Sequence, residues 1–94
     1  MEINIKVFLD AEGRIRQIPA PHKKKLAVLS YLAEKIEPGR QYGEKEVNQI
    51  IQHWHTFNDY FLLRRLLIDH KFLGRLADGS AYWVLQRDDI AGGL

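Results

Sequence analysis

Six basic residues are the side chains of this sequence that are best suited to contact nucleic acid. They form a lysine run, an arginine pair and one later arginine: Lys23, Lys24, Lys25, Arg64, Arg65 and Arg75. Lysine and arginine bind phosphate, and arginine also reads the guanine edge in the major groove of DNA. The net charge is only +2, however, and acidic residues are interspersed through most of the sequence. The charge therefore permits binding to double-stranded DNA, while an ordinary solvated helix start is the alternative for the lysine run.

A second group of candidate residues is apolar and is expected on the same helix as the arginine pair. Four residues at helical spacing are expected to face the core: Leu63, Leu66, Leu67 and His70. This assignment places three apolar residues on the other sides of the helix: Phe61, Leu62 and Ile68. A helix that reads DNA more often carries polar side chains there, and Asp69 would repel phosphate. An exposed apolar patch instead indicates contact with a protein partner or with a second copy of the chain.

The arginine pair and the apolar residues leave three interpretations open. In the first, Arg64 and Arg65 form structural ion pairs, and the apolar residues pack under an N-terminal hairpin. In the second, this face of the helix binds DNA, and in the third it binds a protein. The choice depends on whether the N-terminal segment covers the helix.

Four histidines raise the question of a metal site: His22, His53, His55 and His70. His53 and His55 are the closest pair, but at this spacing their side chains would leave a helix in nearly opposite directions. Cysteine, a common zinc ligand and nucleophile, is absent. The sequence also lacks the serine-hydrolase, phosphate-loop and metalloprotease motifs. We therefore expect no enzymatic activity, no cofactor and no metal ion.

The hydrophobic pattern places the candidate residues on three helices of an α+β fold. Apolar residues recur at helical spacing over about 22–36, 44–54 and 57–70. Thr56 or Asn58 is expected to cap the third helix, because a short polar side chain at this position accepts a hydrogen bond from a free backbone N–H.

Short strands are predicted on both sides of the helices. Alternating apolar and polar residues predict a hairpin over 3–18, with its turn at Ala11-Glu12-Gly13. A second hairpin, the wing, is predicted over 75–85 around the two-residue turn Asp78-Gly79. Arg40-Gln41-Tyr42 is expected to pair with this wing. The order of elements predicts a small winged helix, three helices and a C-terminal wing hairpin, with an extra N-terminal hairpin.

The length and composition are typical of one small domain. With 94 residues the chain can bury a modest core. It has no apolar run long enough to cross a bilayer, and Met1–Lys6 lacks the layout of a signal peptide. We therefore expect a single winged-helix-like domain over 1–94, with a loose tail at 86–94, located in the cytoplasm and away from the membrane.

Six segments of the sequence resemble a known domain family: Phe8–Arg14, Ile18–Leu29, Tyr42–Ile50, Leu63–Asp69, Phe72-Leu73 and Asp78–Trp83. The most specific of its motifs is a leucine followed by two arginines and later an aspartate, here Leu63-Arg64-Arg65 and Asp69. The family is a bacterial winged-helix-like domain of unknown function, found alone or attached to transcriptional regulators. The resemblance implies a winged-helix-like fold and a bacterial regulatory context, and it implies no catalytic residues.

Two hypotheses for function follow. The first is a non-enzymatic bacterial regulatory domain that binds DNA through a winged helix-turn-helix. The alternative is a protein–protein interaction or dimerisation module on a winged-helix frame that does not read DNA. Salt-dependent binding to random duplex DNA, lost when Arg64 and Arg65 are changed to Ala, would distinguish the first hypothesis from the second.

Overall fold

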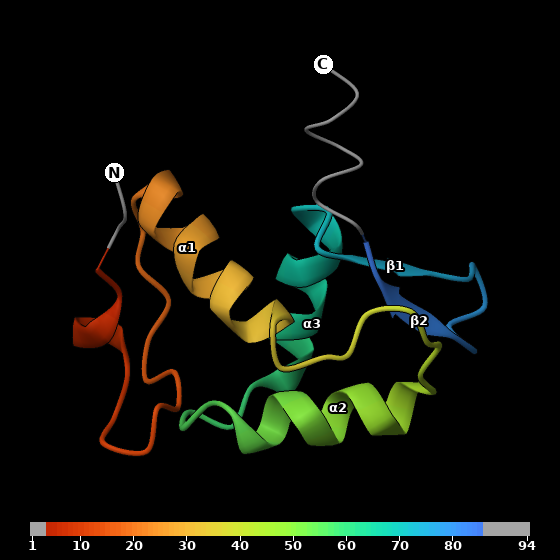
Figure 1. The fold of residues 1–94 in the computed structure, drawn as a ribbon, viewed down its shortest axis with the longest axis horizontal. Coiled ribbons are helices and arrows are strands. Elements are labelled where there is room, and N and C mark those ends of the chain that lie inside the picture. The colour runs from red at the N-terminus through yellow and green to blue at the C-terminus, as the bar shows by residue number, and fades with distance from the viewer. Residues whose placement is uncertain (1–3, 86–94) are drawn as a thin grey trace.

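The computed structural model of the chain describes residues 4–85. Three α-helices are followed by two short strands, an order that is consistent with a winged helix (Figure 1). The elements are η1 (Lys6–Phe8), α1 (His22–Ala33), α2 (Glu44–His53), α3 (Tyr60–Asp69), β1 (Leu73–Arg75) and β2 (Tyr82–Val84). The predicted helices and C-terminal hairpin are confirmed. The predicted tail at 86–94 lies outside the described residues.

The helices are shorter than the sequence pattern predicts, because turns continue the pattern beyond the helix ends. After α1, the N–H of Lys35 donates to the carbonyl of Leu32 at 3.0 Å, and that of Ile36 donates to Ala33 at 3.1 Å. These tighter bonds carry Ile36 into the core, where its side chain is 1% exposed. Periodicity therefore locates the buried residue correctly but overstates the length of the α-helix.

The predicted N-terminal hairpin is wrong. Within the described part of 3–18, the chain forms the 3₁₀ turn η1 and only a single bridge, between Leu9 and Ile15. Strand alternation would place Val7 on the apolar face and Phe8 on the opposite face, but in the structure Phe8 is buried and Val7 is 60% exposed. Asp10 organises the loop that follows, because its carboxylate accepts the backbone N–H groups of Glu12 and Arg14 at 2.9 and 2.8 Å. Local side-chain hydrogen bonds have replaced a strand ladder.

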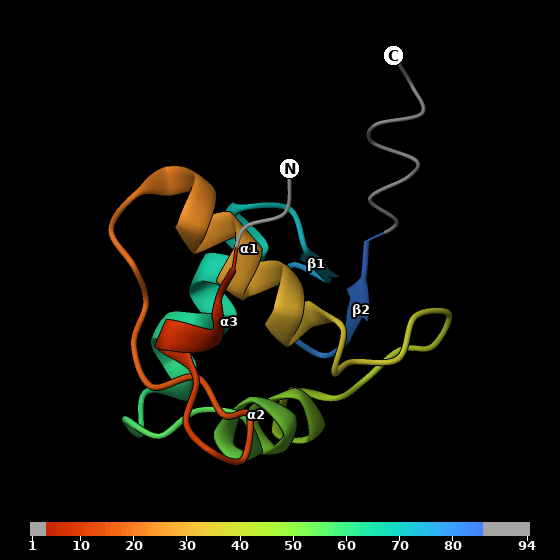
Figure 2. The same ribbon diagram turned by 60° about the vertical axis from the view of Figure 1, so that its left-hand side comes forward.

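The N-terminal segment is attached to the turn between α2 and α3. The N–H of Ile15 donates to Trp54 at 2.8 Å, and the carbonyl of Ile15 accepts from Thr56 at 2.9 Å. The Tyr31 hydroxyl on α1 donates to the carbonyl of Gly13 at 2.6 Å. Figures 1 and 2 both show this segment running beside α1 to the end of α2. It closes one side of the core and does not cover the outer residues of α3, since Phe61 and Leu62 are 58% and 40% exposed.

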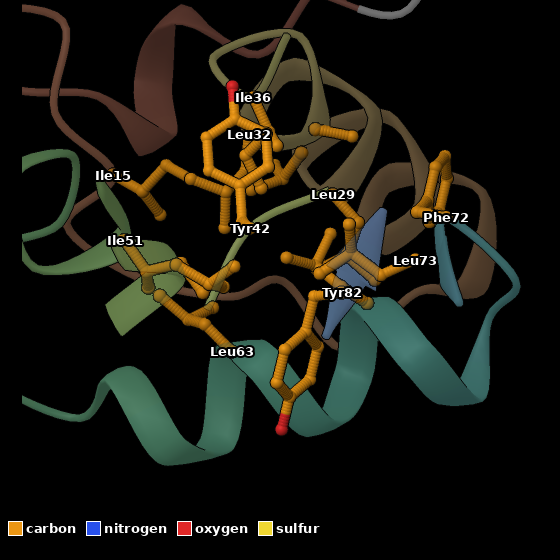
Figure 3. Close-up of a cluster of buried hydrophobic side chains, with 14 of the residues drawn as sticks. Ile15, Leu29, Leu32, Ile36, Tyr42, Ile51, Leu63, Phe72, Leu73 and Tyr82 are labelled. Carbon is orange, nitrogen blue, oxygen red and sulfur yellow. The ribbon is translucent and has the colours of Figure 1, made fainter. Parts of the chain in front are cut away.

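The core lies where the three helices meet the hairpin. Its side chains include Leu29 and Leu32 from α1, Val47 and Ile51 from α2, Leu63 and Leu67 from α3, Leu73 from β1 and Tyr82 from β2. Figure 3 shows most of these side chains packed in one cluster, with Ile15 reaching it from the N-terminal segment. Each helix thus contributes one apolar stripe to the same interior.

Asp59, and not Thr56 or Asn58, caps α3. The Asp59 carboxylate accepts the backbone N–H of Leu62 at 3.1 Å, the bond expected of an N-cap side chain. Asn58 cannot take this role because it lies in the turn with φ of 52° and its side chain binds Gln52 at 2.7 Å. The extra turn residues start the helix at Tyr60, three residues later than the periodicity predicts.

The hairpin begins earlier and has a wider connection than the sequence predicts. β1 and β2 are antiparallel, with Leu73 opposite Val84 and Arg75 opposite Tyr82. Asp78-Gly79 lies within a longer loop, in a turn closed by the Gly79 N–H and the Leu76 carbonyl at 2.9 Å. Gly79, at φ of 76°, supplies a conformation that most residues avoid.

Gly74 lies in the middle of β1, where the Trp83 ring covers it. A Cβ atom at position 74 would lie 2.7 Å from atoms of that ring. Glycine is therefore needed here for the close approach of an aromatic side chain.

The Arg40–Tyr42 segment pairs with the hairpin through one bridge. Tyr42 and Tyr82 exchange two backbone hydrogen bonds of 2.8 Å, so the predicted pairing is confirmed at a single position. This bridge ties the segment before α2 to β2 and fixes the start of α2 beside the hairpin. None of the helices within residues 4–85 is long and apolar enough to cross a membrane.

Candidate binding surface on the third helix and the hairpin

The arginine pair is separated by the turn of α3 into two different environments. Leu63 and Leu67 are 0% exposed and direct one side of the helix into the core. The side chain of Arg64 is 12% exposed, whereas that of the next residue, Arg65, is 68% exposed. Because successive helical residues differ by about 100° in direction, adjacent arginines cannot share one role here.

Arg64 is held against the start of α2. Its Nη1 atom donates a short hydrogen bond to the Asn48 side-chain carbonyl and lies 4.0 Å from a Glu44 carboxylate oxygen. Its guanidinium carbon also lies 5.3 Å from the centre of the Phe61 ring and 5.7 Å from that of Tyr82. These contacts link α3, α2 and β2, so the interpretation of Arg64 as a structural residue is supported.

Arg65 is only loosely paired. Its Nε atom lies 3.9 Å from the Asp69 carboxylate one helical turn away, and both side chains are more than half exposed. An exposed pair of this kind contributes little to stability, typically well below about 1 kcal/mol. Arg65 therefore remains available for a binding partner.

Tyr82 connects the core to the surface of the site. Tyr82 as a whole is 2% exposed, and its hydroxyl donates to the Glu44 carboxylate at 3.3 Å. In Figure 3 the hydroxyl oxygen points away from the other labelled core side chains. Burial raises the pKa of the Tyr82 hydroxyl above its ordinary value, with the positive charge of Arg64 opposing the shift and Glu44 reinforcing it. The hydroxyl is therefore a neutral hydrogen-bond donor at ordinary pH.

A pocket of about 330 Å³ lies between α3, the hairpin and the first residue of α2. Its lining combines three arginines, two carboxylates and three apolar or aromatic side chains: Arg64, Arg65, Arg75, Glu44, Asp69, Phe61, Ile68 and Tyr82. The structure thus brings three of the six predicted basic residues together. Glu44 and Tyr82 were missed by sequence reasoning, because only the folded chain places them beside α3.

Exposed apolar side chains occur in the first turn of α3 and in the hairpin loop, and one of them, Phe61, lines the pocket. Phe61 and Leu62 are 58% and 40% exposed, so the prediction that they are accessible agrees with the structure. Ile68, predicted to share the same surface, is half-buried and packs against the core. Tyr60 and Leu76 are also exposed, at 39% and 46%, and were not predicted. From the sequence, their exposure could have been inferred only from their positions, Tyr60 at the start of α3 and Leu76 in the hairpin loop.

Comparison with known proteins gives one result. Residues 14–84 match the family described as "Uncharacterized protein conserved in bacteria (DUF2087)". The chain belongs to this family. The predicted bacterial family of unknown function is therefore confirmed. No curated protein and no solved structure matches the chain significantly.

The lysine run of this DUF2087 domain lies apart from the pocket. Lys23 and Lys24 are exposed and Lys25 is half-buried in the first turn of α1, and none of the three lines the pocket. The preceding residue, His22, packs its ring 5.8 Å from that of His70, just beyond the C-terminal end of α3. The lysines thus lie near the last turn of α3, while Arg64 is anchored to the start of α2.

The histidines of the DUF2087 domain do not gather into a ligand set. His55 is 4% exposed, and its Nδ1 atom lies 2.7 Å from the Ile51 carbonyl. Its Nε2 atom accepts the backbone N–H of Asp59 at 2.7 Å, so Nδ1 carries the proton that bonds to Ile51. Among residues 4–85, no group of three or more potential metal-binding side chains is found. His55 acts as a structural link between α2 and α3.

Proposed function

We propose that this DUF2087 domain is a non-enzymatic regulatory module whose α3–hairpin surface binds a protein partner and does not read DNA. This surface consists of Tyr60, Phe61, Leu62, Arg65 and Leu76. It would be a winged-helix frame in which the usual recognition helix has been adapted to protein contact. The family resemblance supports a bacterial regulatory context for such a module.

The observation that carries this proposal is the environment of Arg64. Arg64, one of the two adjacent arginines predicted to contact a base or phosphate, is 12% exposed and is bound to Asn48 and Glu44. The first turn of α3, which reads bases in helix-turn-helix proteins, presents Tyr60, Phe61 and Leu62 in its place. Aromatic side chains flanked by arginine are typical of the centres of protein interfaces.

The charges of the surface also favour protein over DNA. Arg65 lies beside Asp69, and Asp78 lies near the tip of the hairpin loop. A DNA-binding surface gathers basic residues along one continuous path, whereas the lysine run here begins a different helix and lies outside the pocket. The three exposed aromatic or leucine side chains in the first turn of α3 would gain nothing from contact with a phosphate backbone, whereas burial against an apolar protein surface would be favourable.

Site-specific photo-cross-linking tests the protein contact. A photoreactive phenylalanine analogue at position 61 or 62, expressed in the bacterial host, should give a discrete protein adduct after illumination. The same analogue at Glu34, an exposed position directly after α1 and away from the proposed surface, is the matched control and should give none. Mass spectrometry of the adduct then distinguishes a second copy of this chain from a different protein. Equal cross-linking from position 34 would contradict the proposal.

DNA binding is measured in parallel by fluorescence anisotropy with random duplex DNA at low and at physiological salt. We expect no saturable binding at concentrations up to roughly 100 µM, the weak end of non-specific affinities. Binding in the low micromolar range that falls steeply with salt, and that is lost in Arg65→Gln and Arg75→Gln, would establish the DNA hypothesis instead. Lys45→Gln, which removes the same charge from an exposed position on α2, controls for net charge.

A further inference from the structure

The pocket between α3 and the hairpin has a charge that its own residues do not balance. Three guanidinium groups and two carboxylates line it, so one positive charge has no counterpart within the lining. Arg75 is exposed and makes no ion pair with any residue in the described range 4–85. The pocket is therefore suited to a ligand with one negative charge.

Arg64 lines this pocket, and part of its guanidinium makes no hydrogen bond within the described residues. Both of its polar contacts, with Asn48 and Glu44, are made by Nη1. No side-chain nitrogen or oxygen is both buried and without a hydrogen-bond partner in the described chain, so the Nε and Nη2 atoms of Arg64 are not fully buried, although the side chain as a whole is only 12% exposed. Nε and Nη2 form one edge of the group, and such an edge binds a carboxylate through two parallel hydrogen bonds.

The remaining lining suits an apolar body attached to that charge. Phe61, Ile68 and the ring of Tyr82 border the pocket, and its volume of about 330 Å³ is at the small end of ligand sites. An inorganic anion would leave these apolar surfaces in contact with water, whereas an aromatic or branched aliphatic group would cover them. The Tyr82 hydroxyl, held only by a long hydrogen bond of 3.3 Å to Glu44, can donate to the ligand instead.

We infer that this pocket binds a small organic carboxylate, a compact apolar group bearing a single negative charge. The Nε–Nη2 edge of Arg64 holds the carboxylate, Arg75 supplies the second positive charge, and Phe61 packs against the apolar group. This inference goes beyond the proposed protein contact, since ligand binding can be measured on the isolated chain with no protein partner present.

Benzoate is a suitable probe, and backbone amide NMR of the full chain is a suitable measurement. At constant ionic strength, benzoate should shift amide signals of α3 and of the two strands in a saturable way. Benzamide, which has the same ring without the charge, and acetate, which has the charge without the ring, should each bind at least about tenfold more weakly. Inorganic phosphate should also bind more weakly than benzoate.

Three variants separate the parts of the site. Arg75→Gln should weaken benzoate binding about tenfold, and Arg64→Lys, which keeps the charge but loses the two-bond edge, should do the same. Phe61→Ala should weaken benzoate but leave acetate unchanged. Lys24→Gln removes one charge from an exposed position outside the pocket and should leave all affinities unchanged. The amide spectrum of each variant shows directly whether it is folded.

Several results would overturn the inference. Equal binding of benzoate and benzamide would show that the arginines do not bind the negative charge. Phosphate binding as tight as that of benzoate would show that the apolar lining does not contribute. If Lys24→Gln and Arg75→Gln weakened benzoate binding equally, the net charge of the protein, and not the pocket, would explain the affinity. Signal shifts confined to residues outside α3 and the hairpin would place the ligand elsewhere.

Discussion

The two sides of α3 differ in almost every physical property that can be compared. On the inner side Leu63 and Leu67 are 0% exposed, while on the outer side Phe61 is 58% exposed and Arg65 68%. Ten residues of helix therefore serve two separate purposes. The inner side fixes the position of α3 against α1 and α2, and no core packing fixes the exposed side chains of Phe61 and Arg65 on the outer side. Residues that no packing requires are the ones that a binding function can select.

Replacing a residue of the inner side should have the largest effect on stability. We expect Leu67→Ala to lower the free energy of unfolding by about 2–5 kcal/mol, because it leaves a cavity at a fully buried site. Urea denaturation followed by circular dichroism measures this loss as a lower midpoint with an unchanged slope. Leu76→Ala is the matched control, since Leu76 is 46% exposed, and should change the free energy by less than about 0.5 kcal/mol. A similar loss of unfolding free energy in both variants would contradict the distinction between a buried inner side and an exposed outer surface.

His55 lies in the turn before α3 and is buried with the inner side of the helix. Replacing it should have the next largest effect on stability. His55→Ala removes the partners of the Ile51 carbonyl and the Asp59 N–H, so we expect a loss of about 2 kcal/mol. His53→Ala, at an exposed position two residues earlier, serves as the control and should cost less than about 0.5 kcal/mol. If His55→Ala were as mild as His53→Ala, the turn would not belong to the buried side.

Tyr82 lies at the boundary between the two sides and should show an intermediate effect. Tyr82→Phe keeps the buried ring and removes only the hydrogen bond to Glu44, for which we expect a loss of about 1 kcal/mol near neutral pH. Burial holds the pKa of Tyr82 above its ordinary value of 10.0. The unfolded chain therefore ionises first as pH rises, and the contribution of the hydroxyl to stability is complete below pH 10.0 and is lost above it.

Denaturation of both proteins at a series of alkaline pH values measures this effect. The difference in unfolding free energy between the native chain and Tyr82→Phe should narrow as pH rises above 10.0. Other groups titrate equally in both proteins and cancel in the difference. A difference that grows with pH would show that the hydroxyl is stabilised as an anion, contrary to the burial of its ring.

The inner side of the molecule could be predicted from the sequence, because periodicity reports burial. Leu63 and Leu67 were both expected in the core, and the order of helices and wing followed from the same signal. The N-terminal hairpin was mispredicted because alternation cannot detect a competing local interaction. The Asp10 carboxylate binds two backbone N–H groups, and Ile15 pairs with the α2–α3 turn in place of a second strand.

The outer side could be predicted only in part, because it depends on neighbours distant in sequence. The arginine pair stood out by composition, but the contacts with Asn48 and Glu44 on α2 hold Arg64, whereas Arg65 has only a loose, exposed pair with Asp69. No spacing rule connects positions 44, 64 and 82. The site thus required the packing of α2 against α3 and the bridge between Tyr42 and Tyr82 that fixes the hairpin beside them.

The smallest expected effect on stability is on the outer side itself, where it is the most informative. Phe61→Ser removes an aromatic ring that is 58% exposed, so we expect a change in unfolding free energy within about 0.5 kcal/mol. The same variant should abolish partner cross-linking from position 62, since exposed aromatic side chains dominate interface energies. A loss of stability comparable to that of Leu67→Ala would instead show that Phe61 supports Arg64 structurally through their ring contact. Stability and binding measured on one variant therefore establish whether the two sides of α3 are independent.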